Sequence, residues 1–265
     1  MSILTHRFPT TTHPLGAKTV FCYGMTKCGS TLAFETTRSA LELSGFPQPR
    51  LSESALGISR KINFCQHLNS NNINALKNEV RAIGHPIAIK THTRPDPVVI
   101  NMIDQGDALV QATYRDPREM ALSMLDHGRK SRQSGMNAFS EIKDLDDAMR
   151  NIRSQIDSLT QWLYRPNCLP IYYSDLAFSQ IDTTRRILAQ LQLDIDPRRV
   201  IKHVAQNRFT QMNKAVRDRY RHEMTRTQSR AFRRAFPQFY DTLIKQRKSL
   251  SGFGEPPLRD GYELV

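Results

Sequence analysis

The spacing of apolar and polar positions along the chain predicts an α/β fold. Short apolar runs predict buried strands at 18–23, 86–92, 107–115 and 168–176. Amphipathic spacing predicts helices at 30–45, 72–84, 116–128, 145–164 and 180–193. Strands that alternate with helices along a chain usually form a mostly parallel central sheet with helices on both faces. In such a sheet, ligands bind beyond the carboxyl ends of the strands, so polar groups there are the first candidates for chemistry.

The length of 265 residues fits one large α/β domain. Within a single domain at 1–265, we expect residues 1–17 to form an irregular N-terminal arm and residues 198–265 to form a basic, mostly helical C-terminal part. No stretch approaches the roughly 18 consecutive apolar residues of a membrane span. The N-terminus also lacks the basic segment and apolar core of a signal peptide. No membrane partner is therefore expected.

The strand-to-helix connection "GMTKCGST", at 24–31, has the spacing of a phosphate-binding loop. Its two glycines permit a tight turn, and the backbone N–H groups at the start of the following helix attract an anion. In a Walker A loop the lysine follows the second glycine, whereas Ser30 follows Gly29 here and Lys27 lies inside the loop. The sequence therefore predicts a P-loop-type domain with a displaced lysine; an ordinary strand-to-helix turn is the alternative.

Charged side chains also follow the second and third predicted strands. Lys90 and His92 are two positions apart, so an extended chain points them to the same side. Arg115 ends the third strand, and Asp116 and Pro117 are typical of a helix start immediately after it. A lysine or histidine at a strand end is, taken singly, usually a solvated surface group. Their coincidence with the glycine-bounded loop favours a common anion site.

Four short motifs resemble those of the sulfotransferase family, and they occur in that family's order over residues 18–195. "KCGST" resembles the family's 5′-phosphosulfate loop, and "KTH" followed by Pro95 resembles the K-T-H-x-P stretch of cytosolic members. Arg115 with Ser123 resembles the 3′-phosphate motif, and "YYSDL" resembles the "YEDL" that closes a later strand. The order makes the resemblance more specific than any single motif.

The resemblance implies that the donor is 3′-phosphoadenosine 5′-phosphosulfate (PAPS) and that no metal is required. It implies that His92 is the general base and that Lys27 and Lys90 offset charge on the leaving oxygen. The donor-binding positions that it implies are Lys27, Cys28, Gly29, Ser30, Thr31, Leu32, Arg115, Ser123 and Tyr173. Such a donor has two anionic ends and therefore needs two anion sites. A sulfuryl group carries less charge than a phosphoryl group, so side-chain cations can stabilise its transfer without Mg²⁺.

Two departures from the family pattern leave alternatives open. The family's glycine-rich basic motif near the C-terminus is absent, so we expect Lys214 and Arg217 to reach the 3′-phosphate, with Arg219 or Arg221 as alternatives. A solvated helix face is the other interpretation of this basic run. Leu32 stands where an aromatic residue often follows the loop, which weakens the expected adenine contact there. Some branches of the family use a glutamate base, so Glu35 and Glu53 remain alternatives to His92.

The net charge of +13 favours an anionic ligand or a polyanion, although a solvated basic surface explains it equally well. The four cysteines form no C-x-x-C pair, which indicates a reducing, cytoplasmic location. Polar groups near the predicted pocket are compatible with a small polar acceptor: Asp126, His127, Asn137 and Glu141.

The sequence thus predicts a sulfotransferase acting on a hydroxyl or amine of a small-molecule acceptor. A P-loop kinase or NTPase, or a basic nucleic-acid-binding module, is the alternative. Nucleic acid is the less favoured partner because no helix-turn-helix or aromatic RNA motif is visible. The oligomeric state stays open, with a homodimer as one option.

Overall fold

The computed structural model describes residues 13–57, 62–208, 210 and 216–241. The chain divides into two compact units, Met1–Arg219 and Tyr220–Val265. The first unit contains the sheet, and the second contains α10 (Tyr220–Glu223) and α11 (Arg226–Ala235). Whether the whole chain acts as one domain stays a prediction. Most of the predicted arm at 1–17 lies outside the described residues, as does the chain beyond 241.

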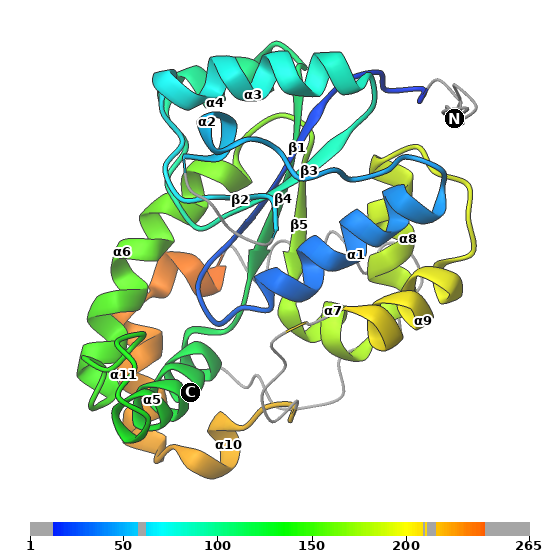
Figure 1. Cartoon of the computed structure of the whole chain (residues 1–265). Coiled ribbons are helices and arrows are strands. Elements are labelled where there is room, and N and C mark those ends of the chain that lie inside the picture. The colour runs from blue at the N-terminus through cyan, green and yellow to red at the C-terminus, as the bar shows by residue number, and fades with distance from the viewer. Residues whose placement is uncertain (1–12, 58–61, 209, 211–215, 242–265) are drawn as a thin grey trace. The chain divides into compact units, whose positions relative to one another are not determined.

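The first unit is built on a five-stranded sheet in the order β2-β3-β1-β4-β5 (Figure 1). The strands are β1 (Thr19–Gly24), β2 (Phe64–Cys65), β3 (Ile87–Thr91), β4 (Ala108–Tyr114) and β5 (Cys168–Tyr172). Every neighbouring pair is parallel, which confirms the predicted mostly parallel sheet. The short strand β2 was not predicted, because a two-residue strand has no periodicity to detect.

The parallel register brings the carboxyl ends of the central strands to one edge. Tyr23 of β1 pairs with Thr91 of β3, and Gly24 of β1 pairs with Thr113 of β4. Tyr114 of β4 pairs with Tyr172 of β5. The segments that follow these four strands therefore begin side by side, as the rule for ligand sites in α/β sheets requires.

Helices cover both faces of the sheet, as predicted (Figure 1). One face carries α1 together with α7 to α9, and the other carries α3, α4 and α6. The helices of the first unit are α1 (Ser30–Leu43), α2 (Glu53–Leu56), α3 (Ser70–Ile83), α4 (Pro97–Asp104), α5 (Pro117–Gln133), α6 (Leu145–Leu163), α7 (Tyr173–Phe178), α8 (Gln180–Gln190) and α9 (Pro197–Asn207). No helix among the described residues is long and apolar enough to cross a membrane.

Strand alternation divides β1 between two hydrophobic cores. Val20 and Cys22 belong to the core cluster that includes Phe34 of α1 and Ile187 of α8. Phe21 and Tyr23 point to the opposite face, where both rings pack on Trp162 of α6. Their ring centroids lie 5.7 and 5.4 Å from that of the indole, which is fully buried. The indole Nε1 donates a hydrogen bond to the Thr93 carbonyl oxygen at 3.0 Å, just after β3.

Two element boundaries differ from the sequence prediction by four residues or more. The strand predicted at 168–176 ends at Tyr172, and α7 begins at the next residue. Asp175 lies in the first turn of α7, where an acidic side chain stabilises the helix dipole. The helix predicted at 116–128 continues through Gly128 to Gln133. A Cβ at position 128 would lie 2.4 Å from the Phe139 carbonyl oxygen, so glycine permits a close approach here rather than ending the helix.

We expect Trp162→Ala to lower the free energy of unfolding by about 3–5 kcal/mol, because it removes a fully buried ring and its hydrogen bond. Tyr164→Ala, two residues away, is the matched control: that ring is 65% exposed, so we expect a change within about 0.5 kcal/mol. Urea unfolding followed by circular dichroism measures both values. Equal losses in the two variants would show that the indole does not anchor α6.

Candidate active site

The loop between β1 and α1 is held by its neighbours on two sides. The Met25 amide donates to the Thr113 carbonyl oxygen at 3.1 Å, which ties the loop to β4. The Thr26 amide donates to Gln155 Oε1 at 2.6 Å, and Gln155 Nε2 donates to Thr26 Oγ1 at 2.8 Å, which ties it to α6. The loop is thus fixed by both the sheet and a helix.

Two residues of this loop have left-handed backbone conformations, Lys27 with φ of 62° and Gly29 with φ of 82°. Gly29 is the N-cap of α1. A Cβ there would lie 2.7 Å from Cδ2 of Tyr173, so another residue would meet both strain and a clash. The bare backbone at this point leaves the start of α1 accessible beside the Tyr173 ring.

Cys28 turns its side chain away from the pocket. Its Sγ lies 2.7 and 3.1 Å from the carbonyl oxygens of Met25 and Thr113, which share the single S–H as acceptors. The side chain is fully buried, and burial raises the pKa of the thiol to about 12. Of the predicted donor-binding residues, Cys28 thus offers a ligand its backbone alone.

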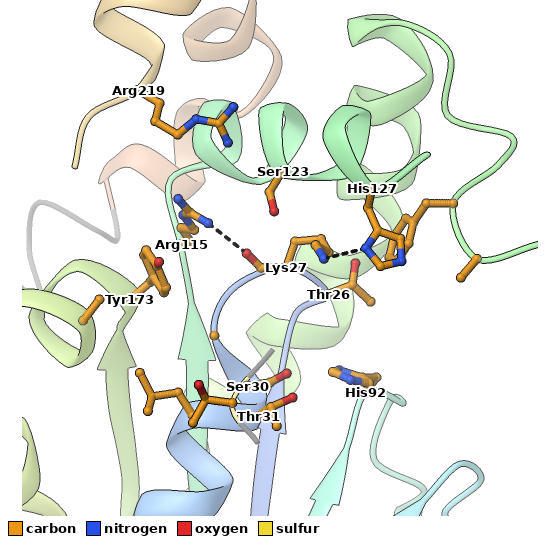
Figure 2. A pocket seen from close by; sticks show the side chains of 16 residues that line it. Thr26, Lys27, Ser30, Thr31, His92, Arg115, Ser123, His127, Tyr173 and Arg219 are labelled. Carbon is orange, nitrogen blue, oxygen red and sulfur yellow. Dashed lines mark hydrogen bonds between the residues drawn. The ribbon is translucent and has the colours of Figure 1, made fainter. Parts of the chain in front are cut away.

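A cavity of about 310 Å³ opens at the carboxyl edge of the sheet (Figure 2). It brings together eight of the predicted donor-binding residues: Lys27, Gly29, Ser30, Thr31, Leu32, Arg115, Ser123 and Tyr173. The predicted base His92 and the alternative cation Arg219 also line it, beside residues outside the four motifs: Thr26, His127, Ala138, Phe139, Ala177 and Thr210. None of these lining residues is Asp or Glu. The cavity therefore combines lysine, arginine and histidine side chains with a helix N-terminus and no lining carboxylate.

Lys90 supports the cavity from behind. It is buried at the end of β3 and does not line the cavity itself. Its Nζ donates to Oγ1 of Thr31 at 2.8 Å, across from the start of α1. The Thr31 hydroxyl therefore stands between the Lys90 ammonium and the cavity.

The imidazole of His92 is oriented by the backbone. Its Nδ1 lies 2.6 Å from the carbonyl oxygen of Gly24, where β1 ends. A carbonyl oxygen can only accept, so Nδ1 carries the hydrogen and the lone pair of the neutral ring is on Nε2. Phe64 packs against the ring at a centroid distance of 5.7 Å. His92 thus has a defined tautomer at the cavity wall, with Nε2 as its basic nitrogen.

Neighbouring groups hold the Arg115 guanidinium on three sides. Its Nη2 donates to Glu119 Oε2 at 2.8 Å, and its Nη1 donates to the Lys27 carbonyl oxygen at 3.3 Å. The guanidinium lies over the Tyr173 ring, with Cζ 3.9 Å from the centroid. Its Nε is buried and has no hydrogen-bond partner. A buried, unpaired N–H is energetically costly, so an acceptor atom that reached it would stabilise the site.

Lys27 is the second cation of the cavity, and its charge is disfavoured in the absence of an anion. Burial lowers the pKa of its ammonium, and the nearby charges of Arg115 and Lys130 lower it further, against the opposing effect of Asp126. Its Nζ lies 3.2 Å from Nδ1 of His127, as Figure 2 shows. A bound anion would relieve this accumulation of positive charge.

The predicted C-terminal cations are distributed unevenly. Arg219 is buried, lines the cavity, and forms an ion pair with Asp126 of α5 at 2.9 Å. Arg217 is exposed and lies over the Phe178 ring at 4.8 Å, away from the cavity lining. Lys214 lies outside the described residues. The roles predicted for Lys214 and Arg217 stay predictions, and Arg219 is the one of the named alternatives found at the cavity.

The two alternative bases lie away from the cavity lining. Glu35 is buried in α1 and forms ion pairs with Arg38 and Arg208 at 3.7 and 3.5 Å. Burial raises the pKa of its carboxyl group, and these cations only partly oppose the effect. Glu53 is exposed at the start of α2. Within the described part of the chain, no group of three His, Cys, Asp or Glu side chains could hold a metal ion.

Sequence reasoning missed the part of the cavity that faces Lys27. The sequence places His127 only among the polar groups of the acceptor side, and it does not single out Thr26 or Phe139. His127 follows Ser123 by one helical turn of α5, so the two share a face. That spacing was the available signal. Phe139 carries no comparable signal, because its position depends on the packing of the segment between α5 and α6.

Comparison with known proteins agrees with this geometry. The family model described as "Sulfotransferase domain" matches residues 17–241. No curated protein sequence matches the chain significantly.

Several solved structures share the fold. Retinol dehydratase in complex with retinol and PAP has a TM-score of 0.54 at 14% identity, over 87% of this chain and 82% of that one. Mouse sulfotransferase SULT7A1 complexed with PAP has a TM-score of 0.52 at 14% identity, over 84% of each chain. Retinol dehydratase in complex with androsterone and PAP has a TM-score of 0.51 at 15% identity, over 85% of this chain and 81% of that one.

These structural likenesses establish the fold, and the family model extends over most of the 265 residues. The chain therefore belongs to the sulfotransferase family and is an enzyme of the transferase class.

Proposed function

We propose that this enzyme transfers a sulfuryl group from PAPS to a hydroxyl or amine of a small, polar acceptor, with His92 as the general base. The observation that carries the proposal is the cationic cavity at the start of α1, whose lining residues include no carboxylate. Such a cavity favours an anionic ligand, and the family membership identifies the class of reaction. The family match does not fit the alternatives, a P-loop kinase and a nucleic-acid-binding module.

The donor has two anionic ends, and the cavity offers cations for both. The backbone around Gly29, with the hydroxyls of Ser30 and Thr31 and the Lys27 ammonium, suits the 5′-phosphosulfate. Gly29 leaves space that a Cβ would occupy, which supports a close approach of the ligand to the backbone. Lys90 would add its charge through the Thr31 hydroxyl.

The second anion site would be built from Arg115, Ser123 and Arg219, which would hold the 3′-phosphate. The unpaired Nε of Arg115 suits an additional acceptor atom. Tyr173, whose ring lies under the Arg115 guanidinium, and Leu32 also line the cavity and would contact the adenine. Retinol dehydratase and SULT7A1, which share the fold, were crystallised with PAP, and this supports the same nucleotide here.

When bound, the donor supplies a sulfuryl group joined through oxygen to a phosphate that can leave. The chain's own residues would orient the reactants and move one proton. His92 Nε2 would accept the proton of the acceptor hydroxyl or amine, while the Nδ1 bond to Gly24 keeps the ring in that tautomer. The ammonium groups of Lys27 and Lys90 would offset the charge that develops on the departing oxygen.

The acceptor would face His92, Thr26 and Phe139, which line the cavity outside the donor-binding positions. Two of these three side chains are polar, which supports a small polar acceptor. Retinol and androsterone, each present in a retinol dehydratase structure, show that small molecules occupy this fold. A screen of acceptor classes with PAPS would identify the acceptor and separate O- from N-transfer. The predicted cytoplasmic location, and a homodimer as the assembly, stay predictions.

We expect His92→Ala to slow single-turnover sulfuryl transfer by about 10²–10⁴-fold while PAP affinity stays within about twofold, because it removes the base and none of the anion contacts. Transfer of labelled sulfate measures the rate, and calorimetry measures PAP binding. His67→Ala is the matched control, since His67 is exposed and away from the cavity. A near-normal rate for His92→Ala, with a large loss in Glu35→Gln or Glu53→Gln, would assign the base to a glutamate.

We expect PAP affinity to fall as pH rises through the alkaline range. Burial and neighbouring cations lower the pKa of Lys27 in the free protein, and a bound anion favours the charged ammonium. The affinity for PAP is therefore greatest below the pKa that Lys27 has in the free protein, and it falls as pH rises above that pKa. In Lys27→Arg the guanidinium stays charged, so this alkaline loss should disappear. Calorimetry at a series of pH values tests this; an unchanged loss in Lys27→Arg would mean that another group titrates.

A further inference from the structure

His127 contacts the loop lysine directly from α5. Its Nδ1 lies 3.2 Å from Nζ of Lys27, and both residues line the cavity (Figure 2). Asp116 caps the start of α5, which fixes the helix beside the end of β4. The contact thus joins two elements that are each held independently, because hydrogen bonds to β4 and α6 hold the Lys27 loop.

The direction of this hydrogen bond follows from the charges. Burial lowers the pKa of His127, and the positive charges of Lys27 and Lys130 lower it further. Both effects favour the neutral imidazole, and the Lys27 ammonium, which can only donate, is the donor. Nδ1 accepts, so the ring hydrogen is on Nε2. His127 is a neutral acceptor placed among cations.

The ring of Phe139 covers this pair. It meets the His127 ring edge-on at a centroid distance of 5.3 Å and an angle of 78°, and Lys27 Nζ lies 5.7 Å from its centroid. Phe139 has φ of 61°, an unusual conformation for a bulky residue, and such strain persists only where the surroundings impose it.

The surroundings that impose it are polar contacts from α5. Ser131 Oγ donates to the Ala138 carbonyl oxygen at 2.6 Å, just before Phe139. Arg132 Nη1 donates to the carbonyl oxygens of Ser140 and Ile142, each at 2.9 Å. These hydrogen bonds therefore hold the turn that contains Phe139 against α5, the helix that also contains His127.

We propose that His127 is a positioning residue that holds the Lys27 ammonium toward the anionic end of the donor. An ammonium group has three N–H donors, so one bond to His127 leaves two for a ligand. Holding the flexible lysine before the ligand arrives reduces the entropy lost on binding. This inference rests on the proposed function, because it assigns His127 to the same donor site.

His127 would also keep Lys27 charged. The charged groups around Lys27 are Arg115 and Lys130, which disfavour its ammonium form, and Asp126, which favours it. Asp126 is itself paired with Arg219 at 2.9 Å. A neutral acceptor at Nδ1 favours the charged lysine without adding a competing anion to the site.

Two substitutions of similar polarity separate positioning from packing. His127→Asn places the side-chain oxygen about where Nδ1 lies, because both atoms are one bond beyond Cγ. His127→Gln is closer in length to histidine but carries its amide one bond further out. PAP affinity measured by calorimetry should stay within about twofold of the wild type in His127→Asn, and it should fall about tenfold in His127→Gln. The alkaline loss of affinity should move to lower pH in the glutamine variant alone.

PAP binding by the wild type tests the proposed function, and the thermal unfolding midpoint of each variant shows whether that variant folds. Absence of PAP binding by the wild-type enzyme would overturn the proposed function. Normal wild-type binding with an unchanged affinity and pH profile in His127→Gln would overturn the positioning role alone. An equal loss in the asparagine and glutamine variants would also overturn it, because packing and not the acceptor atom would then matter. If His127→Gln does not fold, His127→Ala replaces it, with the same expected loss and the same overturning outcome.

Discussion

The parallel register of β3, β1 and β4 is the constraint on which the site depends. It brings the ends of three strands together, so that Gly24, His92 and Thr113 become neighbours although they are distant in sequence. Short hydrogen bonds then connect the strand ends: Nδ1 of His92 donates to the Gly24 carbonyl oxygen, and the Met25 amide donates to that of Thr113. The loop, the candidate base and the arginine after β4 are therefore held in place by the sheet itself.

Within this frame, electrostatics determines what the cavity can bind. Arg115 lies close enough to Lys27 to disfavour the positive charge of that lysine, and the nearby carboxylates form ion pairs with arginines. Glu119 pairs with Arg115, and Asp126 pairs with Arg219. These pairs orient the cations without blocking the cavity lining. An anionic ligand is then the partner that lowers the free energy of the site most.

Much of this could be predicted because it depends on local sequence. The apolar runs identified four of the five strands, and the glycine-bounded connection located the anion loop. The local sequence pattern mispredicted element ends at positions where tertiary packing determines the conformation. Tyr173 begins a helix, not a strand end, and Gly128 continues a helix because another segment packs closely on it. Cys28, inside the loop motif, turns its thiol into the interior, where its single S–H lies between two carbonyl oxygens.

The sequence by itself determined the fold class, the loop with its displaced lysine, and the order of the charged groups at the strand ends. These follow from periodicity, glycine positions and residue chemistry, which act over a few neighbouring residues. The tertiary structure alone decided that His127 accepts from Lys27, that Phe139 covers the pair, and that Arg219 reaches the cavity. Each of these contacts joins residues far apart in the chain, and their distances are set by how helices and loops pack on the sheet.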